Sequence, residues 1–169
     1  MIQVWLACLF LAVVFITTYS DLKVHKIYNK ILLPAILCAL VLHSMAGQFI
    51  AFVFSTMMAF SLFFLVFVFG LTSPGDVKLF AVLGGIAGSI PVVQKAFVIC
   101  AIIQFIIALY ALIKACRHQK MSPYQVIKTD VMGYLTKSGS VIQPIQFPAA
   151  ALIGLSFCIS EGLNYTALI

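Results

Sequence analysis

Charge is scarce in this sequence, and acidic residues are the scarcest of all. Only 8% of the 169 residues are charged, with four acids against ten bases, while 64% are hydrophobic. A soluble domain of this length could not cover its surface with so few polar side chains. Together with the mean hydropathy of +1.19, this indicates an integral membrane protein. Its length allows about six short membrane spans.

Paired cysteines are also lacking. The five cysteines form no CxxC pattern and lie mostly in apolar runs, where a free cysteine behaves as a small hydrophobic residue. The three histidines are dispersed along the chain. We therefore expect no disulfide framework, no metal site and no cofactor. No basic stretch precedes the first apolar segment, which argues against a cleaved signal peptide.

Long apolar runs divide the chain into spans and loops. We predict an all-α membrane protein with a single polytopic domain over residues 1–169. Gly84 and Gly88 form a GxxxG pattern that would let a neighbouring helix approach closely. The spans are expected at about 2–19, 31–45, 49–71, 77–90, 96–113 and 147–160, and the cytoplasmic loops at 20–30, 72–76 and 114–144.

The basic residues orient this arrangement. Nine of the ten lie in or beside three connections on one side, and only Lys95 falls in a connection on the other side. Basic short loops mark the cytoplasmic side, so both termini are expected to be extracytoplasmic. The bases are scattered and form no contiguous patch with interleaved aromatics. We therefore expect contact with anionic lipid headgroups and no nucleic-acid binding.

Two of the four acids lie at the predicted cytoplasmic edge of the membrane. Asp21 follows the first span and Asp76 precedes the fourth, so both are expected at the cytoplasmic edge. An ionisable group at membrane depth indicates a functional site. A close pair of carboxylates suits aspartic proteolysis, because one can deprotonate water while the other protonates the developing oxyanion. The residues alone leave three alternatives open: helix caps, solvated boundary residues, or the cation or proton site of a transporter.

The residues around Asp21 resemble a family motif. In DLKVHKIYN the aspartate is followed by a basic segment and then by Ile27 and Asn29. This order is similar to the first motif of the type IV prepilin and preflagellin peptidases, which are GxGD-type membrane aspartyl proteases. In that motif an aspartate precedes a basic segment and Ile-Pro-Asn. Tyr28 stands where the family usually has the proline.

The residues around Asp76 resemble the second motif of the same family, GxGDxK. In SPGDVKLF, Gly75, Asp76 and Lys78 match, whereas Ser73 stands where the family usually has its first glycine. Pro74 fixes its own φ and Gly75 tolerates conformations that other residues avoid, so this turn can still bend sharply. The final QFPAAALIG resembles the proline-led last helix of the family. The three matching segments are distributed over nearly the whole chain.

The resemblance implies that Asp21 and Asp76 form a catalytic dyad. The expected substrate is a prepilin-like precursor with a basic leader and a hydrophobic helix, cleaved at the cytoplasmic face of the inner membrane. Because the chain begins at a membrane span, it resembles the short peptidase-only form that serves Flp- or Tad-type pili, and no methyltransferase activity is expected. Asp76 begins a helix, so we expect it to be the ionised partner. Ser73 leaves open the alternative of a catalytically degenerate assembly protein of a pilus or secretion system.

Overall fold

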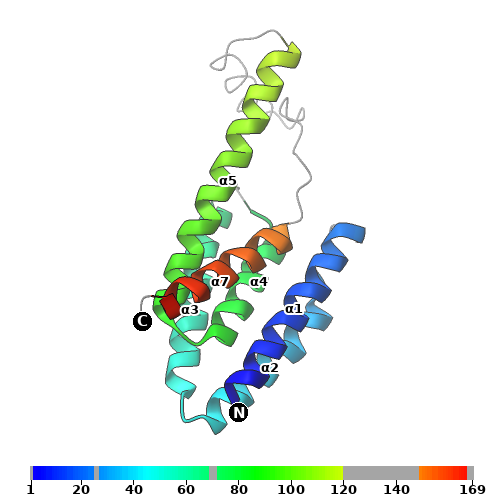
Figure 1. Ribbon diagram of the computed structural model, residues 1–169. Coiled ribbons are helices and arrows are strands. Elements are labelled where there is room, and N and C mark those ends of the chain that lie inside the picture. Colours follow the sequence, from blue (N-terminus) through cyan, green and yellow to red (C-terminus); the bar gives the residue numbers. More distant parts are fainter. Residues whose placement is uncertain (1, 25–26, 69–71, 120–148, 167–169) are drawn as a thin grey trace. The chain divides into compact units, whose positions relative to one another are not determined.

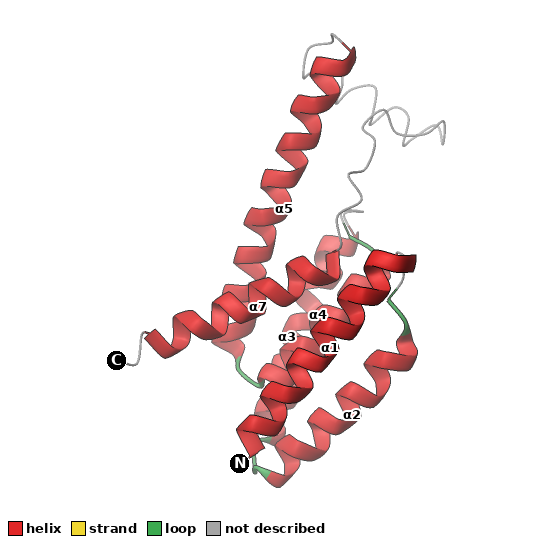
Figure 2. Cartoon of the chain, turned by 45° about the vertical axis from the view of Figure 1, so that its right-hand side comes forward, coloured by secondary structure: helices red, strands yellow, loops and turns green. Residues whose placement is uncertain are grey.

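The computed structural model describes residues 2–24, 27–68, 72–119 and 149–166, and every regular element within these ranges is an α-helix. The predicted all-α fold is therefore confirmed for the described part of the chain. The helices are α1 (Ile2–Val24), α2 (Asn29–Met45), α3 (Phe49–Val68), α4 (Pro74–Ala87), α5 (Ile90–Gln119) and α7 (Ala149–Thr166), as drawn in Figure 1 and Figure 2.

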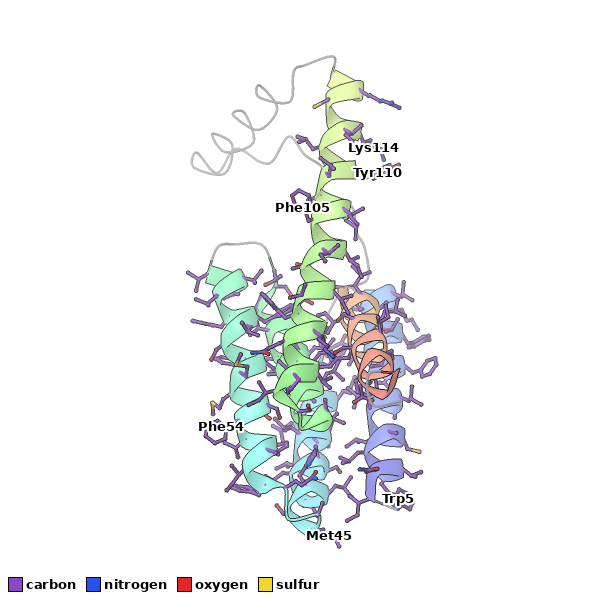
Figure 3. All side chains as sticks on the ribbon, turned by 60° about the vertical axis from the view of Figure 1, so that its left-hand side comes forward. Trp5, Met45, Phe54, Phe105, Tyr110 and Lys114 are labelled. Atoms are coloured by element: carbon purple, nitrogen blue, oxygen red, sulfur yellow. The ribbon has the colours of Figure 1, made fainter. Side chains whose placement is uncertain are left out.

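The chain divides into two compact units. The first comprises residues 1–100 and 148–169, and it holds α1 to α4, the start of α5, and α7. The second comprises residues 101–147 and is described over 101–119, the remainder of α5. Along this stretch Phe105 and Tyr110 project outward from the helix (Figure 3). The prediction of a single domain over residues 1–169 stays a prediction.

Three helices are long and apolar enough to cross a membrane, namely Ile2–Val24, Phe49–Val68 and the Ile90–Lys114 part of α5, while α2 and α7 are shorter apolar helices. Large apolar side chains are exposed on them, as Trp5 and Phe54 show in Figure 3. Such extensive apolar surface suits lipid and not water. These features are those of a membrane protein. The number of about six spans and the extracytoplasmic termini stay predictions.

The helices run past the predicted spans at the ends that carry the two aspartates. Helix α1 continues to Val24, so Asp21 is helical and does not lie in an irregular loop over 20–30. Helix α4 begins at Pro74, so Asp76 lies in its first turn. Nothing in the Asp-Leu-Lys stretch breaks a helix, and proline suits the first helical position. Helix α5 likewise extends to Gln119 within the predicted loop 114–144, of which residues 120–144 lie outside the described residues.

Helix α4 forms the centre of the first unit, where it packs against α1, α2, α3 and α7 and buries most of its side chains. A Cβ added to Gly84 would lie 2.5 Å from the Cβ of Ala59, so α3 approaches the α4 backbone closely. Gly85 faces α3 as well. The predicted GxxxG pairing is wrong for Gly88, which ends the helix in the left-handed conformation at φ +61° and faces His43 of α2.

Aromatic rings join α4 to the helices around it. The Phe80 ring stacks on that of Phe63 in α3, with centroids 4.0 Å apart. Phe80 also contacts Phe157 of α7 at 4.9 Å and meets Phe97 of α5 edge-on at 6.4 Å. Aromatic pairs in these arrangements stabilise packing beyond the area they bury. This cluster holds α7 against α4 and so helps to position the start of α7.

Candidate active site

The start of α4 is held by a reciprocal pair of hydrogen bonds. Ser73 is the N-cap in an extended conformation, and its hydroxyl accepts the backbone N–H of Asp76 at 3.3 Å. In return, the Ser73 N–H donates to Oδ2 of Asp76 at 3.0 Å. This is a capping box, with Pro74 at the first helical position. Serine in place of the family glycine therefore binds the neighbouring aspartate directly.

Asp21 is held by a different helix. It lies near the end of α1, is only 9% exposed, and its Oδ2 accepts the backbone N–H of Ala150 at 3.1 Å. Ala150 is in the first turn of α7, whose backbone N–H groups lack partners within the helix. Asp21 thus caps α7 through a residue that lies 129 positions further along the chain. The partial positive charge at that helix end favours a carboxylate.

The close fit of α7 against α1 depends on Gly154. A Cβ at this position would lie 2.5 Å from Cγ1 of Val14, which is closer than real Cβ contacts. Glycine therefore lets α7 lie against α1 and bring the Ala150 N–H to Asp21. Spacing in the sequence does not reveal this contact, although the proline-led QFPAAALIG segment marks the region.

Asp21 and Asp76 lie on two helices that pack together. Both are buried, at 9% exposure for Asp21 and 8% for Asp76, and α1 packs against α4. Asp76 precedes the predicted span 77–90. Burial raises its pKa, the hydrogen bonds from Ser73 lower it, and the negative charge of Asp21 raises it further. This electrostatic effect is consistent with the pairing of the two acids, which stays a prediction.

The residues predicted to support the dyad also meet. Lys78 Nζ donates to Oδ1 of Asn29 at 3.3 Å, which joins the second motif to the first. A Cβ added to Gly75 would lie 3.4 Å from that of Ile27, so Ile27 lies beside this position. The reason offered for Gly75 was wrong, however, because the positive-φ glycines of the described residues are Gly47 and Gly88. A Cβ at Gly75 would make ordinary van der Waals contact with Ile27.

The one histidine whose side chain the structure describes, His43, lies away from this site. His43 lies near the far end of α4, where Nε2 meets the carbonyl of Ile86 at 3.1 Å. His25 lies outside the described residues, and the His118 side chain is likewise not described. Within the described part of the chain no three His, Cys, Asp or Glu residues gather in a way that could hold a metal ion. The chemistry available at the described site is therefore that of two carboxylates, backbone N–H groups and Lys78.

Composition and helix lengths together define a helical membrane protein, and two of its acids are buried at helix ends. The type IV leader peptidase family matches residues 8–113. The chain belongs to this family, and membership implies a peptidase that acts on leader peptides. The match includes Asp21, Asp76 and both surrounding motifs, whereas Ala150 and Gly154 lie beyond it. Neither a curated protein nor a solved structure matches the chain.

Proposed function

We propose that this protein is a membrane aspartyl endopeptidase that removes the basic leader from prepilin-like precursors, using Asp21 and Asp76 as a dyad. The observation that supports the proposal is that two buried acids, one from each motif within the matched range, lie on helices that pack together, and that the charge of Asp21 raises the pKa of Asp76. Each acid is oriented by a backbone N–H, from Ala150 for Asp21 and from Ser73 for Asp76. Such restraint positions the reacting groups in advance, which is worth a large part of a catalytic barrier.

Different surroundings give the two acids different roles. The Ala150 N–H orients the Asp21 carboxylate, which we assign as the base. Burial favours the neutral form of Asp76, so we assign Asp76 as the acid. The sequence led us to expect the opposite assignment, with Asp76 ionised. The protons are shared by a coupled pair, so the apparent pKa values belong to the dyad.

Hydrolysis follows from this assignment. Asp21 takes a proton from water as the water oxygen attacks the scissile carbonyl carbon, and Asp76 gives its proton to the carbonyl oxygen. When the tetrahedral intermediate collapses, the carbon–nitrogen bond breaks and the leaving nitrogen takes the proton from Asp21. Asp76 regains its proton as the carbonyl re-forms. Asp76 uses Oδ2 for the capping bond, which leaves Oδ1 to face the substrate.

The substrate and its location follow from the charge distribution. The bias of basic residues toward one side supports an active site at the cytoplasmic face of the inner membrane. The hydrophobic helix of the precursor would lie in the bilayer, and its basic leader would approach the acid pair from the cytoplasm. The proposed activity is peptidase activity alone, in a pilus or secretion system of the Flp or Tad type.

Cleavage of a precursor tests the proposal. The chain is co-expressed with a small protein that carries a basic leader, a glycine and a hydrophobic helix, and shortening is followed by mass spectrometry. We expect wild type to shorten the precursor, and Asp21→Asn or Asp76→Asn to abolish cleavage while the protein stays in the membrane. Asp130→Asn, a carboxylate-to-amide change outside the described residues, is the matched control and should cleave normally. Full cleavage by Asp76→Asn would overturn the dyad.

The same assay separates the alternatives. A catalytically degenerate assembly protein would leave the precursor intact even in the wild type. A transporter that uses the acid pair would also leave it intact, and its ion flux would depend on Asp21 and Asp76. The capping box supports the peptidase, because Ser73 restrains the aspartate that a degenerate motif would release.

A further inference from the structure

A polar cavity lies at the opposite end of α1 and α4 from the two aspartates. Its volume is about 380 Å³, and it is bordered by the first half of α1 and by the ends of α2, α4 and α7. Ile86, which lines it, is ten residues beyond Asp76, or about 15 Å along the helix axis at 1.5 Å per residue. The cavity is therefore separate from the candidate active site. Its polar lining includes Gln3, His43, Gln48 and Glu161.

His43 is fixed in one tautomer at this cavity. The side chain is only 2% exposed, and Nε2 is 3.1 Å from the carbonyl oxygen of Ile86. A carbonyl can only accept, so Nε2 carries the hydrogen and Nδ1 presents a lone pair. Nδ1 is buried and has no hydrogen-bond partner among the described residues. An unpaired buried acceptor is costly, which points to a donor that is supplied from elsewhere.

Glu161 is the acidic residue of the lining. It is partly buried near the end of α7, and its carboxylate is an acceptor at the same cavity as His43. None of the described residues that line the cavity is a lysine or an arginine. An anionic group such as phosphate would be repelled here, whereas a cation with N–H groups would satisfy both acceptors. The remaining lining, with Leu6, Phe10 and Leu11, suits an alkyl chain.

We propose that this cavity binds a primary ammonium group attached to an alkyl or acyl portion. The ammonium N–H groups donate to the Glu161 carboxylate and to Nδ1 of His43, and the apolar portion lies along α1. A membrane lipid with an ethanolamine headgroup and a free long-chain amine share this chemistry. Bound there, the ligand contacts α1, α2, α4 and α7 and stabilises their packing. The site does not depend on the proposed peptidase activity.

Thermal unfolding of the purified full-length protein in detergent tests the ligand chemistry. The probe is octylammonium, with octyltrimethylammonium as a control of equal charge that has no N–H, and octanol as an uncharged control. We expect octylammonium alone to raise the unfolding midpoint. Glu161→Gln, which keeps the side-chain shape, should weaken its apparent affinity about tenfold or more, as loss of a charge-assisted hydrogen bond does. Ser44→Ala, next to His43 but exposed, should retain the full response.

Lipid bilayers then identify the source of the ammonium group. The protein is placed in nanodiscs of phosphatidylethanolamine or phosphatidylcholine with the same anionic lipid content. A higher midpoint in phosphatidylethanolamine that Glu161→Gln removes assigns the site to lipid, and a response to octylammonium without this difference assigns it to a free amine. Equal stabilisation by octyltrimethylammonium, an unchanged response in Glu161→Gln, or no response to either ammonium source overturns the proposal.

Discussion

Replacement of Ser73 tests whether the reciprocal hydrogen bonds at the start of α4 hold Asp76. Ser73→Ala removes the hydroxyl that accepts the Asp76 N–H at 3.3 Å, but keeps the backbone N–H that donates to the carboxylate at 3.0 Å. Replacing an N-cap serine by alanine typically costs about 1 kcal/mol, whereas glycine costs only a few tenths. Ser73→Gly removes the same hydroxyl and restores the residue usual in the family, so the two variants separate the capping role from the family pattern.

The expected changes can be measured in purified protein. A loss of about 1 kcal/mol lowers the Tm of a chain of this size by roughly 2–4 °C, which we expect for Ser73→Ala. Ser73→Gly should unfold within about 1 °C of wild type. If the same free energy of about 1 kcal/mol is also lost from the stabilisation of the transition state, kcat/KM for precursor cleavage falls about fivefold in Ser73→Ala. Thermal unfolding and initial cleavage rates give both quantities on the same preparations.

A matched serine provides the control. The Ser44 hydroxyl donates only to the Leu40 carbonyl of its own helix, at 2.7 Å, and is exposed. Ser44→Ala should therefore change stability by less than about 0.5 kcal/mol. If Ser73→Ala unfolded at the same temperature as wild type, the Ser73 hydroxyl would not stabilise the start of α4, and the N-cap role of Ser73 would be refuted.

Three further outcomes follow from the packing around the site. Gly154→Ala should destabilise the protein by about 1–3 kcal/mol and slow cleavage, and Val14→Ala should restore part of both losses in the double variant, as unfolding and rate measurements will show. Lys78→Met and Asn29→Leu should each change stability by less than about 1 kcal/mol, because their hydrogen bond is exposed, and a double-mutant cycle should give a coupling of similar size. Gly88→Ala should lower the Tm more than any of these exposed changes, because its φ is +61° and a Cβ would meet a buried histidine ring.

The sequence by itself determined the class of the protein and the identity of the two acids. Apolar runs predict helices in a membrane because the cost of exposing backbone and polar groups to lipid acts within each segment of about 20 residues. Asp21 and Asp76 stood out for the same reason, since so few charges lie beside these runs. The proximity of Ile27 to Gly75 and the contact of Asn29 with Lys78 join residues that both motifs had already marked.

Helix ends were less predictable, because boundaries depend on local capping. Ser73 looked like a departure from the family pattern, yet it fits the N-cap position because a hydroxyl there accepts the N–H of Asp76. Gly88 looked like half of a helix-packing pair, yet it terminates α4 with a positive φ. The structural roles of both residues become clear only when the first and last turns of the helix are known.

The tertiary structure alone decided which distant groups meet. The bond from the Ala150 N–H to Asp21 joins positions 129 residues apart, and it depends on Gly154 letting α7 lie against Val14 of α1. The cavity beside His43 likewise forms from four helices that are not consecutive in the chain. Hydrophobic periodicity indicates which segments are removed from water, but it does not indicate which helices pack against one another in the bundle. That choice is made by side-chain shape and by the pairing of buried polar groups, and it placed Asp21 and Asp76 on helices that pack together.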